Sequence, residues 1–312
     1  MLVEADCGRD PLVTVSKKRA MKPSIHDKIF NTIVYIILAM AMLLVLYPLY
    51  FMLIASFSDP NAIFQGRVIF IPKGITLRGY EMMFSNQLIW RSYLNSIIYT
   101  ISGVIISLAV TIPAAFALSR KELIGNSLIM KLIIFTMYFS GGIIPLYLVV
   151  RSLRLLNNMF ALILPSAIVT YNLIVARAFY LNMIPEELHE ASVLDGCNYT
   201  KFFFYVVLPL SKAILAVMVL FYSNKMWNGF FDALIYLTSE RKYPLQLVLR
   251  TILLQNQAMA MVADDTVLIE AARATELIKY GIVIVASFPM LCLYPFIQKH
   301  FVSGVMIGAV KG

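Results

Sequence analysis

The stretch from Asn182 to Pro209, NMIPEELHEASVLDGCNYTKFFFYVVLP, gathers acidic, aromatic and helix-ending residues in an order that suits docking rather than bond-making chemistry. Pro185 is favoured in a first helical turn, and two glutamates follow it at the positive end of the helix dipole. The helix is expected to run to Asp195 and to end at Gly196, which readily adopts a left-handed conformation. Asn198 can then cap a second short helix.

The second short helix carries three consecutive phenylalanines and two valines, and a bend is expected after it, at Leu208 and Pro209. The complete segment is a helix, a glycine hinge and a helix. It is amphipathic and too charged to cross a bilayer. We therefore expect it to lie against the membrane or in the groove of a partner protein.

Motifs for catalysis or nucleotide binding are missing from the sequence. It contains no G-x-x-x-x-G-K-[ST] loop for phosphates, no H-E-x-x-H and no convincing Ser-His-acid set. The cysteines Cys7, Cys197 and Cys292 stand alone, without metal-ligand spacing. We therefore expect the chain to be no enzyme and to hold no cofactor or metal.

A second polar set interrupts the otherwise apolar run from Ala213 to Leu237. Asn224, Asn228 and Asp232 recur every four residues, which predicts one helical stripe facing a bundle interior or a wet cavity. Interhelical hydrogen bonding and substrate contact explain this stripe equally well. Lys225 lies off the stripe by about 100° and can snorkel or pair with an acid.

The elements that position these residues must be membrane helices. Of the 312 residues, 60% are hydrophobic and only 14% are charged, and the mean hydropathy is +0.80. Soluble domains are roughly half apolar and about one quarter charged. The composition excludes an ordinary cytosolic enzyme, a disordered chain and a disulfide-stapled secreted fold. The net charge of +9 suits a bilayer surface better than nucleic acid.

Charge-free stretches locate the membrane spans, because a charge at the bilayer centre is costly. Each stretch suits one helix of about 20 residues. The stretches lie between Lys28 and Asp59, Arg91 and Arg120, Lys131 and Arg151, Arg154 and Arg177, and Lys279 and Lys299. With the interrupted run 213–237 as the fifth span, the sequence predicts an all-α membrane protein with six transmembrane helices.

Both ends of the chain are predicted to be cytoplasmic. Residues 1–28 are basic and lack the short apolar core and cleavage site of a signal peptide, so we interpret them as a retained tail. Six spans place the termini on one side, and the distribution of Lys and Arg favours the cytoplasm weakly. The predicted organisation is tail 1–28, a six-helix membrane domain 29–298 and a second tail 299–312.

The stretch 182–209 resembles the cytoplasmic EAA loop in permease subunits of binding-protein-dependent ABC importers. The family pattern is E-A-A, three residues, glycine, nine residues and I-x-L-P. Ser192 for alanine and Val206 for isoleucine are the only departures. Every spacing is matched, by Glu190, Ala191, Ser192, Gly196, Val206, Leu208 and Pro209. The resemblance covers the chain from about Lys28 to Gly312. Within the family, the chain is similar to the maltose-type group and to its subunits for complex-carbohydrate uptake. Segments 140–158, 227–237 and 304–312 prompt this.

The resemblance implies a type I, maltose-type permease fold in a bacterial cell membrane, with residues 182–209 as a coupling loop that docks into a cleft on an ATPase subunit. ATP is then expected to bind in the ATPase, and no cofactor in this chain. The implied partners are a second homologous permease, a pair of ABC ATPases, an extracytoplasmic substrate-binding protein and the lipid bilayer, but no nucleic acid. The implied function is ATP-driven import of an oligosaccharide or complex sugar.

Sugar sites use aromatic faces, amides and hydroxyls, so the candidates for a substrate pathway are Tyr171, Asn172, Asn224, Trp227 and Asn228. Aromatic residues of membrane helices more often serve packing or belong to the interfacial belt, and the partner permease could hold the sugar instead. Loops 59–91 and 238–279 are long enough to meet the binding protein. The second loop contains LQNQAMAMVADD, which by analogy with the family is expected to contact the binding protein. The alternative is that this segment is a helix packed across the pore mouth. Gly304, Gly308 and Gly312 belong to a tail that we expect to reach the ATPases.

An ion-coupled secondary transporter or channel for a small polar solute is the alternative function. Such carriers usually contain repeats and intramembrane acids, and only Asp232 qualifies, near a span end. A membrane enzyme would need paired acids or metal ligands, which do not stand out in the sequence. Dependence of transport on ATP separates the importer from both.

Overall fold

The computed structural model describes residues 24–262, of which 255–262 by their backbone alone, and residues 278–298. The regular elements in these ranges are helices. Two compact units, residues 1–50 and residues 51–312, divide the chain. The predicted tail 299–312, with its three glycines, and all but the end of the predicted tail 1–28 lie outside the described residues.

The first helix, α1, runs from Ile25 to Ser56 and so starts before Lys28, where the tail was predicted to end. Its start has a local cause, because the backbone N–H of Ser24 donates to Asp27 Oδ2 at 3.0 Å and Asp27 also lies in the positive first turn. At 1.5 Å per residue, 32 residues reach about 48 Å, more than the roughly 30 Å hydrocarbon core.

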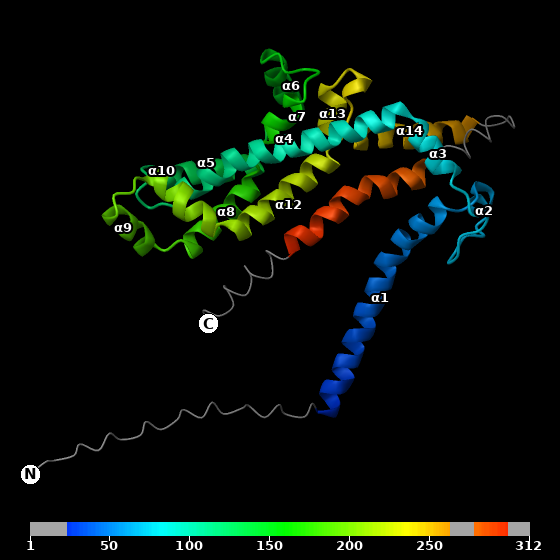
Figure 1. The fold of residues 1–312 in the computed structure, drawn as a ribbon, viewed down its shortest axis with the longest axis horizontal. Coiled ribbons are helices and arrows are strands. Elements are labelled where there is room, and N and C mark those ends of the chain that lie inside the picture. Colours follow the sequence, from blue (N-terminus) through cyan, green and yellow to red (C-terminus); the bar gives the residue numbers. More distant parts are fainter. Residues whose placement is uncertain (1–23, 263–277, 299–312) are drawn as a thin grey trace, which may run out of the picture. The chain divides into compact units, whose positions relative to one another are not determined.

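The remaining elements are short helices that alternate with longer ones (Figure 1). They are α2 (Pro60–Phe64), α3 (Arg78–Ser85), α4 (Gln87–Ala117), α5 (Asn126–Tyr138), α6 (Ile143–Ser152), α7 (Phe160–Ile163), the 3-10 turn η1 (Leu164–Ser166), α8 (Thr170–Met183), α9 (Glu186–Leu194), α10 (Tyr199–Phe202), the π-helix η2 (Phe203–Val207), α11 (Leu208–Leu210), α12 (Lys212–Asn228), α13 (Phe231–Tyr236), the 3-10 turn η3 (Glu240–Lys242), α14 (Leu245–Val262) and a C-terminal helix, Ile278–Gln298.

The core of the second unit is formed where α4 packs along α12 and α8 (Figure 1). Gly103 permits this approach, because a Cβ there would lie 2.9 Å from Met226 Cγ. The Thr111 and Tyr222 hydroxyls, 2.6 Å apart and buried, join α4 to α12. Apolar side chains fill the remaining space, among them Ile112, Leu173, Tyr180 and Met218.

The prediction of one continuous helix in each charge-free stretch is wrong for the third stretch. Between Lys131 and Arg151 the chain leaves α5, breaks, and continues as α6 at an angle of 114°. The break has a backbone cause, because Gly142 precedes α6 with φ 85° and ψ 178°, a conformation that is essentially restricted to glycine.

The fourth stretch is also broken, again against the prediction of one continuous helix. Residues 160–166 and α8 meet at 50°. Pro165 lies in the 3-10 turn just before this break, and proline removes a backbone donor and disfavours a continuous α-helix.

Just before the predicted fifth span, 213–237, the chain bends by 80° at Ser211, between residues 199–210 and α12, directly after the predicted bend at Leu208 and Pro209. The predicted stripe of three polar residues is wrong in its last member. Helix α12 ends at Asn228, Gly229 follows as its C-cap, and Asp232 belongs to a separate helix, α13.

The bundle end that lies away from α9 and α10 is built from α3, α13, α14 and the C-terminal helix (Figure 1). A hydrophobic cluster unites α3, α14 and the C-terminal helix with α4 and α12 through Met83, Ile89, Trp227, Leu245 and Ile282. The predicted outer loop 59–91 contains two short helices, α2 and α3. The segment LQNQAMAMVADD is helical as far as Val262, and the rest of it lies outside the described residues.

Three helices within the described residues are long and apolar enough to cross a membrane: α1, α4 and the C-terminal helix. Each of the three bent pairs also passes this test, so the chain can make up to six crossings. Large apolar side chains stay exposed over long stretches, for example Ile105 at 62% and Leu132 at 58%. A bilayer, rather than water, is the solvent in which such a surface is stable.

Candidate functional site

Residues 182–209, the predicted coupling loop, form the expected helix, glycine hinge and helix. Helix α9 begins after Pro185, carries two glutamates in its first turn and ends at Leu194, with Asp195 as its C-cap. Gly196 follows with φ +75°, and the N–H of Cys197 donates to the carbonyl of Ser192 at 2.9 Å. A left-handed residue and a backbone bond that closes the last turn are the features of a glycine-terminated helix.

The second half of the loop also has a local signal. The Asn198 side chain accepts from the backbone N–H of Lys201 at 2.9 Å, and this caps α10 as predicted. The chain then continues as the π-helix η2, which contains Val206, and as α11, which contains Leu208 and Pro209. Short π segments inside helices are frequent at functional sites.

An aromatic cluster fastens the coupling loop to the membrane helices. The ring of Phe116, in the last turn of α4, lies 5.3 Å from the ring of Phe203 and 6.1 Å from that of Phe202. The same ring meets Tyr180 of α8 edge-on at 5.8 Å. Phe202 and Tyr180 are completely buried. One residue of α4 therefore touches both the loop and the span that leads into it.

His189 connects the two halves of the loop. Its ring stacks on Tyr199 at 4.5 Å and meets Phe202 edge-on at 5.2 Å. Ser192 is buried one turn further on, and its hydroxyl donates to the His189 carbonyl at 2.7 Å. Helices α9 and α10 are thus held in a fixed angle by side-chain packing as well as by the glycine hinge.

Polar contacts fix the neighbouring loop, residues 118–125, in the same place. Arg177 Nε of α8 donates to the carbonyl of Leu118 at 2.7 Å. Asn126 Nδ2 donates to the same carbonyl at 2.9 Å and to that of Arg120 at 2.8 Å. An ion pair at the surface, Lys121 to Glu186 at 3.4 Å, joins this loop to α9. Because this pair is exposed, it contributes little energy.

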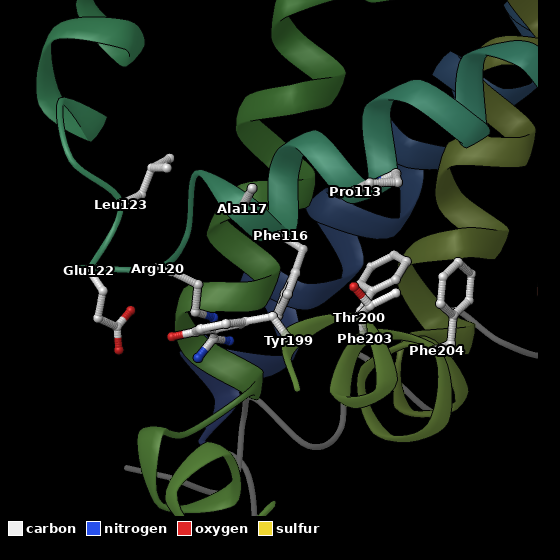
Figure 2. A pocket seen from close by; sticks show the side chains of 10 residues that line it. All are labelled: Pro113, Phe116, Ala117, Arg120, Glu122, Leu123, Tyr199, Thr200, Phe203 and Phe204. Carbon is white, nitrogen blue, oxygen red and sulfur yellow. The ribbon is translucent and has the colours of Figure 1, made fainter. Parts of the chain in front are cut away.

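A cavity of about 510 Å³ separates the loop 118–125 from α10 and η2. Figure 2 shows Phe116 beside it with Arg120 and Tyr199, and Phe203 and Phe204 along another side. The Arg120 guanidinium lies 4.8 Å from the Phe116 ring centroid. Burial lowers the pKa of Arg120, while Glu122, Tyr199 and Glu186 act in the opposite direction, so the group stays cationic at neutral pH.

The residues of the predicted coupling motif divide into an exposed and a packed set. Glu190, Ala191, Gly196 and Pro209 are exposed. The packed residues of the motif are the buried Ser192 and the partly buried Val206 and Leu208. The motif thus contributes both exposed residues at the surface and residues that pack this surface against the hydrophobic core.

Sequence reasoning missed the residues that brace this loop, Phe116, Arg120 and Tyr180. They lie far from the motif along the chain, and no local pattern marks them. It also missed three exposed apolar side chains of α9, Leu188, Val193 and Leu194, the last of them 89% exposed. The sequence did contain a signal for them, because apolar residues beside charged ones on a short helix that does not span the membrane indicate an interaction surface.

The candidates for a substrate pathway lie in different environments. Tyr171 is 54% exposed, whereas its neighbour Asn172 is buried. Asn228 Nδ2 donates to Asn224 Oδ1 at 2.7 Å and to the Asn224 carbonyl at 3.0 Å. Trp227 is 3% exposed, and its indole Nε1 donates to the carbonyl of Ala286 at 2.9 Å. Trp227 therefore packs in the hydrophobic cluster, and it also borders one cavity.

Two cavities flank the end of α12. The first, of about 360 Å³, is lined by Asn224, Trp227 and Asn228 together with Gln246 of α14 and residues of the C-terminal helix. The second, of about 230 Å³, is lined by Lys225, Asn228 and Asp232 together with residues of α4, α7, η1 and α13. Asn228 borders both cavities, so the structure brings three of the predicted polar residues and Lys225 to one region. It places Tyr171 and Asn172 on α8, outside the lining of both cavities.

Among the described residues, no group of three or more His, Cys, Asp or Glu side chains is arranged to hold a metal ion.

Comparison with known protein families by family models gives no match. Individual proteins do match. The chain is 39% identical over 287 residues to the polygalacturonan/rhamnogalacturonan transport system permease protein YtcP of Bacillus subtilis, covering 92% of this chain and 99% of YtcP. It is 39% identical over 265 residues to protein LplC of the same organism, covering 85% of this chain and 89% of LplC.

A solved structure agrees with these relatives. A chain in the crystal structure of a bacterial ABC transporter involved in the import of the acidic polysaccharide alginate superposes with a TM-score of 0.80 at 32% identity. The match covers 89% of this chain and 98% of that chain. The fold and these relatives therefore define a multi-pass membrane permease of the ABC importer type, which is not itself an enzyme.

The chain belongs to the permease subunits of carbohydrate ABC importers. This membership confirms the all-α importer-permease fold expected from the resemblance and sets aside the ion-coupled secondary carrier.

Proposed function

We propose that this chain is one of two permeases in an importer that moves an oligosaccharide across a bacterial cell membrane, and that its coupling loop receives the motion of an ATPase. Permeases of this family imply an ATPase and a substrate-binding protein as partners. In our proposal the second permease is a homologous but separate chain, two ATPase subunits bind all the ATP, and the binding protein delivers sugar from outside.

The observation that carries the proposal is the surface of α9. This helix is too short and too charged to span a bilayer, yet it exposes Leu188, Val193 and Leu194 beside Glu190. A short helix that presents apolar anchors and charge suits a groove on another protein. Because Gly196 and the ring contacts of His189 hold α9 against α10, a movement of α9 would be transmitted to α10.

A path for the motion exists within the second unit. A force on α9 and α10 acts on Phe202 and Phe203, which contact Phe116 of α4, and Phe116 contacts Tyr180 of α8. Because α4 and α8 pack along α12, which borders both cavities, the ATPase could bias the access to these cavities. Such coupling requires two states of the permease that bind the nucleotide-dependent forms of the ATPase differently.

The proposal places the coupling loop, residues 118–125 and both termini in the cytoplasm. The α2–α3 segment and the two cavities at the end of α12 then lie towards the outside, where the binding protein would dock.

Gly196→Val tests the coupling role. No atom lies within 4 Å of a Cβ built at Gly196, so the substitution acts through the backbone, whose φ of +75° is a genuine outlier for a β-branched residue. We expect ATP-driven sugar uptake by the assembled importer to fall at least tenfold, while the amount of inserted protein changes little. Uptake in membrane vesicles and quantitative blotting measure the two effects.

Gly196→Asn is the matched control, because asparagine tolerates the left-handed region, and it should keep most of the uptake. Normal uptake by Gly196→Val at equal protein levels would remove the coupling role from this hinge. Uptake by the unmodified importer that persists without ATP would contradict the proposed function itself.

A further inference from the structure

Lys225 is a cation placed inside the fifth predicted span, in the last turn of α12. Its side chain is exposed to a cavity of about 230 Å³, where Asp232, Asn228 and Ser166 supply further polar groups. Intramembrane charges are costly and commonly mark substrate or ion pathways. Neither the aromatic cluster nor the coupling loop makes use of this group.

The hydrogen-bonding capacity of the Lys225 ammonium is poorly used by the protein. The bond found for it runs to the Ser166 carbonyl at 3.4 Å, which is longer than the usual 2.7–3.2 Å. Within the described residues, no carboxylate oxygen lies within 4.0 Å of the Lys225 nitrogen, and Asp232 shares the cavity without forming a close ion pair. An ammonium has three donors, so a ligand can still be accommodated.

The rest of the cavity suits a sugar. Phe230 and Phe231 line it, and Phe231 is 48% exposed, so an aromatic face is available for a sugar ring. The amide of Asn228 adds a neutral polar group. An aromatic face, an amide and a cation together fit a sugar unit that carries a carboxylate better than a neutral one, because a charge-assisted hydrogen bond to the ammonium is the strongest contact on offer.

We propose that this cavity receives the carboxylate of an acidic, uronate-containing oligosaccharide and that Lys225 determines the preference for acidic over neutral substrate. The inference rests on the proposed function and narrows its substrate class. Two comparisons agree with it: one transporter imports alginate, an acidic polysaccharide, and polygalacturonan, in the name of YtcP, denotes linked galacturonic acid units.

The experiment compares acidic trisaccharides with their methyl esters, which keep the size but lose the charge. The complete importer, with its own binding protein, is reconstituted in proteoliposomes, and ATP-driven uptake of labelled trigalacturonate, trimannuronate and triguluronate and of the corresponding esters is measured. Because the binding protein is the same in every assay, a change of preference between variants belongs to the permease.

For the unmodified chain we expect faster uptake of at least one acid than of its ester. Lys225→Gln should lower uptake of that acid about tenfold and leave the ester within about twofold, since a charged hydrogen bond is lost. Lys225→Arg should keep the preference, and Asp232→Asn should keep or raise it. Lys212→Gln is the matched control at the other end of α12, and it should change neither rate.

Three outcomes would overturn the inference. The unmodified importer could transport esters as fast as acids, Lys225→Gln could lower both equally, or Lys225→Gln could change neither. In each case ATP-driven uptake of sugar would leave the proposed function standing. The absence of any ATP-driven carbohydrate uptake would instead overturn the proposed function together with the inference.

Discussion

Lys225, Trp227 and Asn228 show how three residues within one helical turn acquire different roles. The indole of Trp227 is buried and bonded to Ala286, the ammonium of Lys225 faces one cavity, and Asn228 borders two. Since successive residues of a helix point about 100° apart, these roles follow from which neighbour lies on each side. The predicted role of Trp227 in substrate contact must therefore compete with a packing role.

The packing role predicts a specific loss of stability. Trp227→Phe keeps most of the apolar bulk but removes the buried hydrogen bond from the indole to the Ala286 carbonyl, which contributes about 0.5–1.5 kcal/mol. We expect the Tm of the purified chain in detergent to fall by a few degrees. Differential scanning fluorimetry measures this shift.

Trp90→Phe provides the matched control. The Trp90 indole also donates to a carbonyl, that of Phe84 at 3.1 Å, but the side chain is 43% exposed and water can replace the lost donor. Equal shifts of Tm for the two variants would contradict the distinction between the buried and the exposed indole.

At the scale of elements, the breaks within the predicted spans are the main departure from a simple bundle. The break between α5 and α6 turns the chain by 114°, and the break before α8 turns it by 50°. The first depends on a glycine-only conformation at Gly142, and the second follows Pro165. Breaks of this kind let a short stretch of chain present polar backbone to a cavity rather than to lipid.

The two glycines at the first break should respond differently to alanine. Gly142→Ala places a Cβ on a backbone at φ 85° and ψ 178° and should cost about 1–3 kcal/mol. Gly141→Ala meets only Pro145 Cβ, at an ordinary 3.8 Å, and should be tolerated. Tm and the yield of monodisperse protein measure both. A tolerated Gly142→Ala would show that the break does not need this conformation.

At the scale of the whole molecule, the proposal fixes which face of the second unit is cytoplasmic. In a cysteine-free background, Ile75→Cys lies in the α2–α3 segment and Ile124→Cys lies beside the coupling loop, and both positions are highly exposed, at 78% and 94%. A membrane-impermeant maleimide added to intact cells should label the first and spare the second. Both should be labelled once the cells are permeabilised.

Labelling of both positions from the outside of intact cells would contradict a cytoplasmic coupling loop. Exclusive labelling of Ile124→Cys would invert the proposed orientation. In either case the ATPase could not reach α9 from the cytoplasm, so the same measurement also tests the docking surface.

The sequence by itself determined the features that depend on neighbouring residues. Charge-free stretches located the candidate membrane-crossing segments, because a charge in lipid costs free energy whatever the rest of the fold is. The capping of α10 by Asn198 and the end of α9 at Gly196 were predictable for the same reason, since capping is a contact between a side chain and the adjacent turn.

Only the tertiary structure decided the rest, because it depends on residues that the chain brings together from a distance. Phe116 meets the coupling loop, Lys225 faces a cavity without a close carboxylate among the described residues, and Trp227 packs on Ala286. Helical periodicity correctly grouped Asn224 with Asn228 but wrongly added Asp232, because the helix ends at Gly229. Periodicity holds only as long as the helix does, and where a helix ends inside a bundle depends on what packs against it.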